Sequence, residues 1–72
     1  MNKCSKDYGN YIRERRIKMG LTQEEVAKKL GINQVSYGRY ELGLREPDLE
    51  QIIKISKILG FKPGDFLDNY RG

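Results

Sequence analysis

Apolar residues recur at helical spacing along most of the chain, and capping residues or glycines separate the apolar stretches. The clearest pattern runs from Thr22 to Leu42 and predicts two short helices joined by a tight turn. Thr22, with Glu25 three residues later, forms a capping box that satisfies free amide groups at the start of a helix. Val26, Ala27 and Leu30 follow on one face, so this first helix is predicted over residues 23–30.

The second helix of this unit is predicted over residues 34–42. Gly31 ends the first helix, and Asn33 caps the second. The face expected in the core carries Tyr37, Tyr40 and Glu41, and the opposite face carries Gln34, Val35, Gly38 and Arg39. Two helices joined so tightly cannot run antiparallel, and they should cross steeply as in a helix-turn-helix. Such a unit places its second helix in the major groove of DNA.

Three further helices are expected around this unit. The first runs from about Asp7 to Met19 after a loose polar segment, residues 1–6, and it turns Tyr8, Ile12 and Met19 toward the core. A fourth begins after the cap Asp48 and ends at Gly60, and a short fifth begins at Pro63. The fourth has a broad stripe expected mostly in the core: Leu49, Ile52, Ile53, Ile55, Ser56 and Leu59. The fold class is therefore all-α, with five short helices.

One long stretch resembles a known family. It runs from Arg16 to Glu41 and reads RIKMGLTQEEVAKKLGINQVSYGRYE. This stretch is similar to the helix-turn-helix of the lambda-type repressor and Cro family (XRE-like), and the resemblance extends from about Ile12 to Leu67. It rests on Arg16, Gly20-Leu21-Thr22-Gln23, Ala27, Gly31, Asn33 and Glu41. The resemblance implies a lambda repressor-like DNA-binding domain: one domain over residues 1–72, with its core within 8–68 and the helix-turn-helix at 22–42.

The second helix of the unit carries the residues expected to contact bases. Gln34 stands at its first position, where a glutamine can bond the N6 and N7 atoms of adenine. Val35 suits a thymine methyl group, and Ser36 can bond a base or a phosphate. Arg39, one turn further along, suits guanine or a phosphate. Gly38 is unusual inside a helix, and two interpretations stay open: clearance for DNA, or a tolerated helix weakness.

Two residues outside that helix are expected at phosphates. Gln23 begins the preceding helix, whose free amides and positive dipole end suit an anion. In the family that it resembles, this position contacts the DNA backbone. Arg45 lies in the loop after the second helix, and in similar proteins this loop follows the DNA backbone.

An ion pair between Arg16 and Glu41 is expected inside the domain. Arg16 leans toward the core from the face of Ile12, and an unpaired buried charge is costly. The resemblance implies the same pair. The alternative is that Arg16 extends to solvent and Glu41 is an ordinary surface acid. Arg13, Arg15 and Lys18 are interpreted as a solvated face.

Composition narrows the class of protein. The 72 residues suffice for one small domain, and the net charge of +4 with a pI of about 9.3 fits a polyanionic partner. Cys4 has no second cysteine to pair with, and without histidine a zinc site lacks its usual ligands. No catalytic constellation is present, so no enzyme is expected, and neither a cofactor nor a small-molecule ligand is indicated. No apolar run approaches the ~20 residues of a membrane span, and no signal-peptide pattern occurs, so a cytoplasmic protein is expected.

These observations predict sequence-specific binding of double-stranded DNA by a small transcriptional regulator, most simply a repressor. One recognition helix makes too few base contacts to select one site in a genome, so a homodimer on an inverted-repeat operator is expected. The candidates for the dimer contact are Ile58, outside the apolar stripe, and Tyr70 in the tail. Two alternatives stay open: an antitoxin or other protein-binding module of the same fold, and the controller of a restriction-modification operon.

Overall fold

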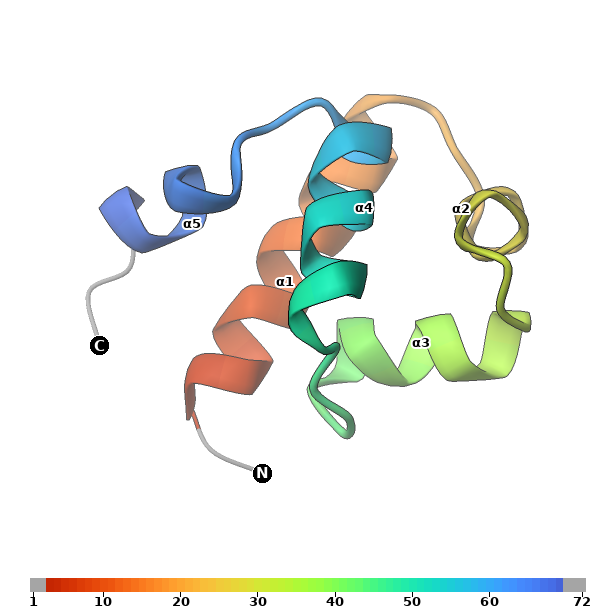
Figure 1. Cartoon of the computed structure of the whole chain (residues 1–72), viewed down its shortest axis with the longest axis horizontal. Coiled ribbons are helices and arrows are strands. Elements are labelled where there is room, and N and C mark those ends of the chain that lie inside the picture. Colours follow the sequence, from red (N-terminus) through yellow and green to blue (C-terminus); the bar gives the residue numbers. More distant parts are fainter. Residues whose placement is uncertain (1–2, 70–72) are drawn as a thin grey trace.

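The computed structural model describes residues 3–69, which form five α-helices and no strand. They are α1 (Lys3–Lys18), α2 (Gln23–Leu30), α3 (Gln34–Leu42), α4 (Leu49–Leu59) and α5 (Pro63–Asn69). Helices α1 and α4 lie against each other in the middle of the molecule, with α2 and α3 on one side and α5 on the other (Figure 1). None of these helices is long and apolar enough to cross a membrane. The all-α class with five helices is confirmed.

The boundaries of α2 and α3 agree with the capping residues read from the sequence. The backbone N–H of Thr22 donates to the Glu25 carboxylate at 2.9 Å, and the Glu25 N–H donates to the Thr22 hydroxyl at 3.0 Å. The Asn33 side chain accepts from the backbone N–H of Ser36 at 2.8 Å and begins α3. Between the two helices, Gly31 adopts a φ of 76°, a left-handed conformation that favours glycine and ends α2.

Helix α1 begins at Lys3, so the prediction that residues 1–6 form a loose segment before a helix from Asp7 is wrong for residues 3–6. A contact with the loop that follows α3 holds this first turn in place. Ser5 is buried, and its hydroxyl donates to the Glu46 carboxylate. One turn later, Gly9 packs so closely on α3 that a Cβ atom there would lie 2.4 Å from the Glu41 carbonyl oxygen.

The core lies where α1, α2, α3 and α4 meet. Its fully buried side chains are Ile12, Val26, Tyr37, Ile55 and Leu59. Several predicted core positions are wrong, because the apolar stripe of α4 is wider than the area that its neighbours cover. Leu49 is 72% exposed and Ile53 is 39% exposed, whereas Ile58 is half-buried against the core. Met19 is also exposed, because it follows the last residue of α1 instead of continuing its buried face.

Candidate nucleic-acid interface

Helices α2 and α3 form a steeply crossed pair. In Figure 1, α2 is viewed nearly along its axis while α3 lies across the view. Val26 of α2 and Tyr37 of α3 are both fully buried and lie in the shared core. The buried side of α3 also includes Tyr40 and Glu41, as the sequence predicted. The rest of α3 is therefore left on the outer surface.

The outer face of α3 carries the residues predicted to contact bases. Gln34, Val35 and Arg39 are exposed, and Ser36 is half-buried. Val35 is 63% exposed, although it is apolar and its neighbours on this face are polar. The face therefore offers hydrogen-bonding groups together with one apolar contact, the combination that base edges and thymine methyl groups require.

An ion pair fixes α3 to α1. The Arg16 guanidinium donates from Nε to Glu41 Oε2 at 2.7 Å and from Nη2 to Oε1 at 3.2 Å. A third donation, from Nη1 to the Leu21 carbonyl at 2.9 Å, ties the same group to the start of the α2 segment. Burial acts to raise the pKa of Glu41, but hydrogen bonds from Arg16 and Gln23 outweigh it and hold this pKa below its usual value.

Gln23 is held by this ion pair. Its Nε2 donates to Glu41 Oε1 at 3.0 Å, so the side chain is oriented across α3. Because a carboxylate only accepts hydrogen bonds, the amide nitrogen must face Glu41.

Gly38 lies beside the Gln23 amide. A Cβ atom at this position would lie 3.6 Å from Gln23 Oε1 and 3.9 Å from Nε2, which is ordinary van der Waals contact. Packing within the described residues therefore does not require a glycine at this position, in contrast to Gly9. If Gly38 does provide clearance, the space that it leaves is for a molecule outside the protein and not for another residue of this chain.

The remaining predicted contacts are more dispersed. Arg45 is exposed in the loop between α3 and α4. Ile58 is half-buried against the core, so only part of its side chain is available for the predicted dimer contact. Tyr70 lies outside the described residues. No group of His, Cys, Asp or Glu side chains within residues 3–69 could hold a metal ion.

Arg15 has a structural role that sequence reasoning missed. The sequence predicts a solvated position for Arg15, but the side chain is half-buried and its Nη2 donates to the carbonyls of Leu59 at 3.2 Å and Gly60 at 2.8 Å. These carbonyls lie at the C-terminal end of α4, where a helix favours a positive charge. No local signal marks this role, because the two partners are far apart in the sequence.

Comparison with protein families gives a match over most of the chain. The family model described as helix-turn-helix matches residues 12–67. One relative is the SPbeta prophage-derived uncharacterized HTH-type transcriptional regulator YonR of Bacillus subtilis (strain 168). It is 42% identical over 60 residues, which cover 83% of this chain and 55% of the relative. The chain thus spans about half the length of the curated relatives that it matches.

Solved structures give the same picture. The restriction-modification controller protein C.AhdI from Aeromonas hydrophila is 31% identical, with a TM-score of 0.79 over 85% of this chain and 92% of that one. The P22 c2 repressor, solved in complex with synthetic operator 9T, is 30% identical, with a TM-score of 0.77 over 82% of this chain and 89% of that one.

Proposed function

The chain belongs to the helix-turn-helix family of transcriptional regulators that includes the lambda-type repressors and Cro, and we propose that it is a repressor that reads one duplex DNA sequence through α3. Gln34, Val35, Ser36 and Arg39 contact base edges in the major groove. The protein acts in the cytoplasm as a DNA-binding regulator and not as an enzyme.

The exposure of Val35 is the observation that carries the proposal. A singly exposed apolar side chain is common on protein surfaces, so it is the position of Val35 among hydrogen-bonding residues on the outer face of α3 that supports a DNA-reading surface. Val35 is 63% exposed between Gln34 and the half-buried Ser36. In the major groove, a thymine methyl group would cover it while its neighbours bond to bases.

Phosphate contacts position the reading helix. The amides at the N-terminus of α2, the second N–H of Gln23 and the guanidinium of Arg45 supply them. Because Gln23 is bonded to Glu41 and Glu41 to Arg16, the phosphate contact at α2 is fixed relative to α1 and α3. These contacts set the register of the protein on DNA without reading its sequence.

We further propose that the protein binds its operator as a homodimer through the C-terminal half. With Ile58 half-buried against the core, the exposed large apolar side chains of α4 and α5 are Leu49 and Ile53 of α4 and Leu67 of α5. They are few, so the dimer is weak until DNA holds both copies. A twofold axis then gives an inverted repeat whose half-site centres lie ~10–10.5 base pairs apart.

Selection of bound duplexes from a random pool, followed by footprinting, tests the reading function. We expect an inverted repeat and a footprint on one side of the duplex. Sedimentation with and without the selected duplex tests the dimer, and two chains per duplex are expected at saturation. One chain per duplex would contradict the dimer while leaving the reading by α3 intact; failure to select any sequence would contradict the reading itself.

A second candidate is the controller of a restriction-modification operon. The likeness to C.AhdI supports it, because this chain covers most of that structure at 31% identity. Such a controller would use the same DNA contacts but activate as well as repress. A reporter gene behind the selected operator distinguishes the two: a repressor lowers expression at every protein concentration, whereas a controller raises it over part of the range.

The third possibility, an antitoxin or other protein-binding module, predicts no salt-dependent, sequence-specific DNA binding in the same experiments.

A further inference from the structure

The loop that carries Arg45 is packed against the first turn of α1. It connects α3 to α4 and begins at Gly43, which ends α3. A Cβ atom at Gly43 would lie 2.8 Å from the Cα atom of Lys6 and 3.0 Å from its backbone nitrogen, so the two backbones are in direct contact. A larger residue at Gly43 would push the loop away from α1. The position of the loop therefore depends on a turn that lies far earlier in the sequence.

A hydrogen bond joins the middle of this loop to the same turn of α1. The Ser5 hydroxyl donates to Glu46 Oε1 across 41 positions of sequence. Ser5 is buried, so water competes little for its hydroxyl. Glu46 precedes Pro47, and a residue before proline favours extended conformations, which limits the directions open to its side chain. The bond therefore fixes Glu46 at one place on α1.

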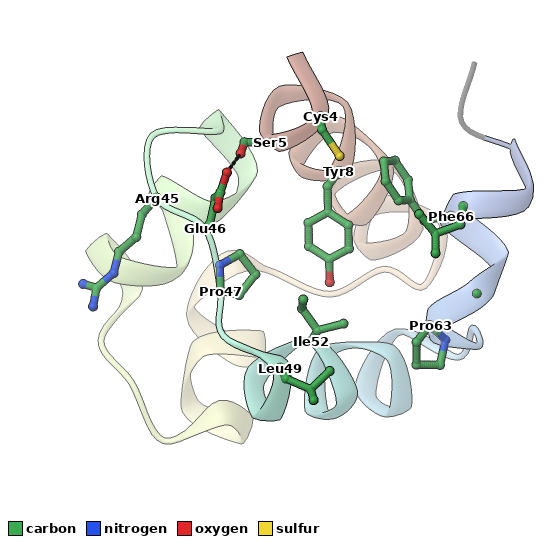
Figure 2. A pocket seen from close by; sticks show the side chains of 12 residues that line it. Cys4, Ser5, Tyr8, Arg45, Glu46, Pro47, Leu49, Ile52, Pro63 and Phe66 are labelled. Carbon is green, nitrogen blue, oxygen red and sulfur yellow. Dashed lines mark hydrogen bonds between the residues drawn. The ribbon is translucent and has the colours of Figure 1, made fainter. Parts of the chain in front are cut away.

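Arg45 and Glu46 point to opposite sides of the loop. Figure 2 shows the Glu46 carboxylate directed toward Ser5, while the Arg45 guanidinium points away from Ser5. Neighbouring side chains alternate in this way along an extended segment. Because Glu46 is held on α1, the exposed Arg45 side chain is kept on the outer side of the loop.

Local hydrogen bonds fix the two ends of the loop. At its start, the backbone N–H of Leu44 donates to the Arg39 carbonyl at 3.0 Å. At its end, the Asp48 carboxylate accepts from the backbone N–H of Gln51 at 2.9 Å and caps α4. Residues 45–47 lie between these two fixed points, and the bond from Ser5 reaches them from another helix.

Residues 45–47 also line an apolar groove. The groove has a volume of about 460 Å³ and lies between the start of α1, this loop, the start of α4, and α5 (Figure 2). Its other walls include Tyr8, Ile52 and Phe66. A segment beside a groove has fewer side chains packed against it than a covered segment, and such segments open most easily. The order of the loop therefore depends on its contacts with α1.

We propose that Ser5 is a positioning residue for DNA binding: through its bond to Glu46, it holds the loop so that Arg45 meets a phosphate of the duplex. Ser5 itself does not touch DNA. This role rests on the proposed function, whereas the ordering of the loop by Ser5 does not. A cation that is ordered beforehand loses less conformational freedom on binding. The bond should therefore raise the affinity for every duplex alike and leave base discrimination to α3.

The first experiment uses the protein without DNA. Backbone NMR relaxation measures the order of residues 44–46 in the wild type and in variants. We expect lower order parameters there in Ser5→Ala and also in Glu46→Ala, because each variant lacks the bond. Glu46→Gln should keep the wild-type order, since its amide oxygen can still accept from Ser5. Wild-type order of this loop in Ser5→Ala would overturn the positioning role.

The second experiment measures binding of the selected operator and of an unrelated duplex at several salt concentrations. Ser5→Ala should weaken binding to both by the same several-fold factor and reduce the salt dependence by up to about one phosphate. Ser56→Ala is the matched control, because it also removes a buried serine hydroxyl, one that donates to the Ile53 carbonyl within α4 at 2.7 Å. The control should lower stability without changing the salt dependence.

A double variant separates a role through Arg45 from a general loss of stability. In the Arg45→Ala background, Ser5→Ala should cause no further loss of affinity and no further change in salt dependence. An equal loss in both backgrounds would overturn the role of Ser5 in the phosphate contact. Failure of the wild type to bind any duplex would instead contradict the proposed function, and the order of the loop in Ser5→Ala would still decide whether Ser5 holds it.

Discussion

Arg16 and Glu41 form a two-point ion pair that joins α1 to α3, the proposed reading helix, across 25 positions of sequence. The pair has N–O distances of 2.7 and 3.2 Å, and the side chains are only 14% and 2% exposed. Such a buried pair is costly to break, because removal of one partner leaves the other charge with poor solvation. The pair also holds Gln23, so it connects the stability of the domain to the geometry of the proposed phosphate contact.

Replacement of either partner should destabilise the domain strongly. We expect Arg16→Ala and Glu41→Ala each to lower the free energy of unfolding by ~3–5 kcal/mol. Urea denaturation of both single variants and the double variant gives the coupling energy. A substantial coupling is expected, because the double variant leaves no unpaired charge; a coupling near zero would mean that solvent, not the partner, satisfies each group.

The same pair predicts a pH dependence of stability. Burial opposes ionisation of Glu41, but the hydrogen bonds from Arg16 and Gln23 outweigh this effect. The pKa of Glu41 in the folded protein therefore lies below the ordinary value of 4.5. A depressed carboxyl pKa contributes stability that is present above about pH 4.5 and is lost as the pH falls through the folded pKa. Denaturation from pH 7 down to pH 3 should therefore show a shallower loss for Glu41→Gln than for wild type.

Glu14→Gln is the control for that experiment, because Glu14 is an exposed acid on α1 away from the pair. It should follow the wild-type pH profile. Identical profiles for the wild type and Glu41→Gln would show that the carboxylate is not stabilised by folding.

Gly38→Ala should separate stability from DNA binding. The new methyl group meets only the Gln23 amide at ordinary distance, and alanine favours a helix over glycine by ~1 kcal/mol. We therefore expect a gain in stability of up to ~1 kcal/mol together with weaker binding of the selected operator. Thermal denaturation and a DNA-binding titration measure the two effects.

Gly9→Ala provides the contrast for Gly38→Ala. Its methyl group would lie 2.4 Å from the Glu41 carbonyl oxygen and 2.6 Å from that of Tyr40, so α1 and α3 would have to separate. A loss of stability of at least ~1–3 kcal/mol is expected. If Gly38→Ala instead leaves DNA affinity unchanged, the glycine is a tolerated weakness of the helix and not a clearance for DNA.

Gln34→Ala and Arg45→Ala should affect DNA binding in different ways. Loss of the paired contact from Gln34 should reduce discrimination at one adenine-containing position by ~1–3 kcal/mol. Loss of Arg45 should weaken all sequences alike and reduce the salt dependence of binding by about one phosphate. Titrations of the operator, a single-base variant and an unrelated duplex at several salt concentrations distinguish these effects. The same change of specificity in both variants would contradict the division of roles.

The sequence by itself determined the features that depend on residues within about one helical turn. Thr22, Asn33 and Asp48 each cap a helix through an amide three residues away, so the starts of α2, α3 and α4 follow from the chain alone. The outward strip of α3 likewise follows from helical periodicity once Tyr37, Tyr40 and Glu41 are assigned to the core.

Only the tertiary structure decided the features whose partners are distant in the sequence. The first turn of α1 is ordered by Glu46, and Arg15 caps α4 from the other side of the core. Burial in α4 depends on which neighbour covers each position, so Ile58 is covered while Leu49 is not. The groove around Tyr8 has walls from separate segments, and no periodicity within one segment encodes it. Local hydrogen bonds are set by adjacent residues, whereas burial and cavities are set by the packing of whole helices.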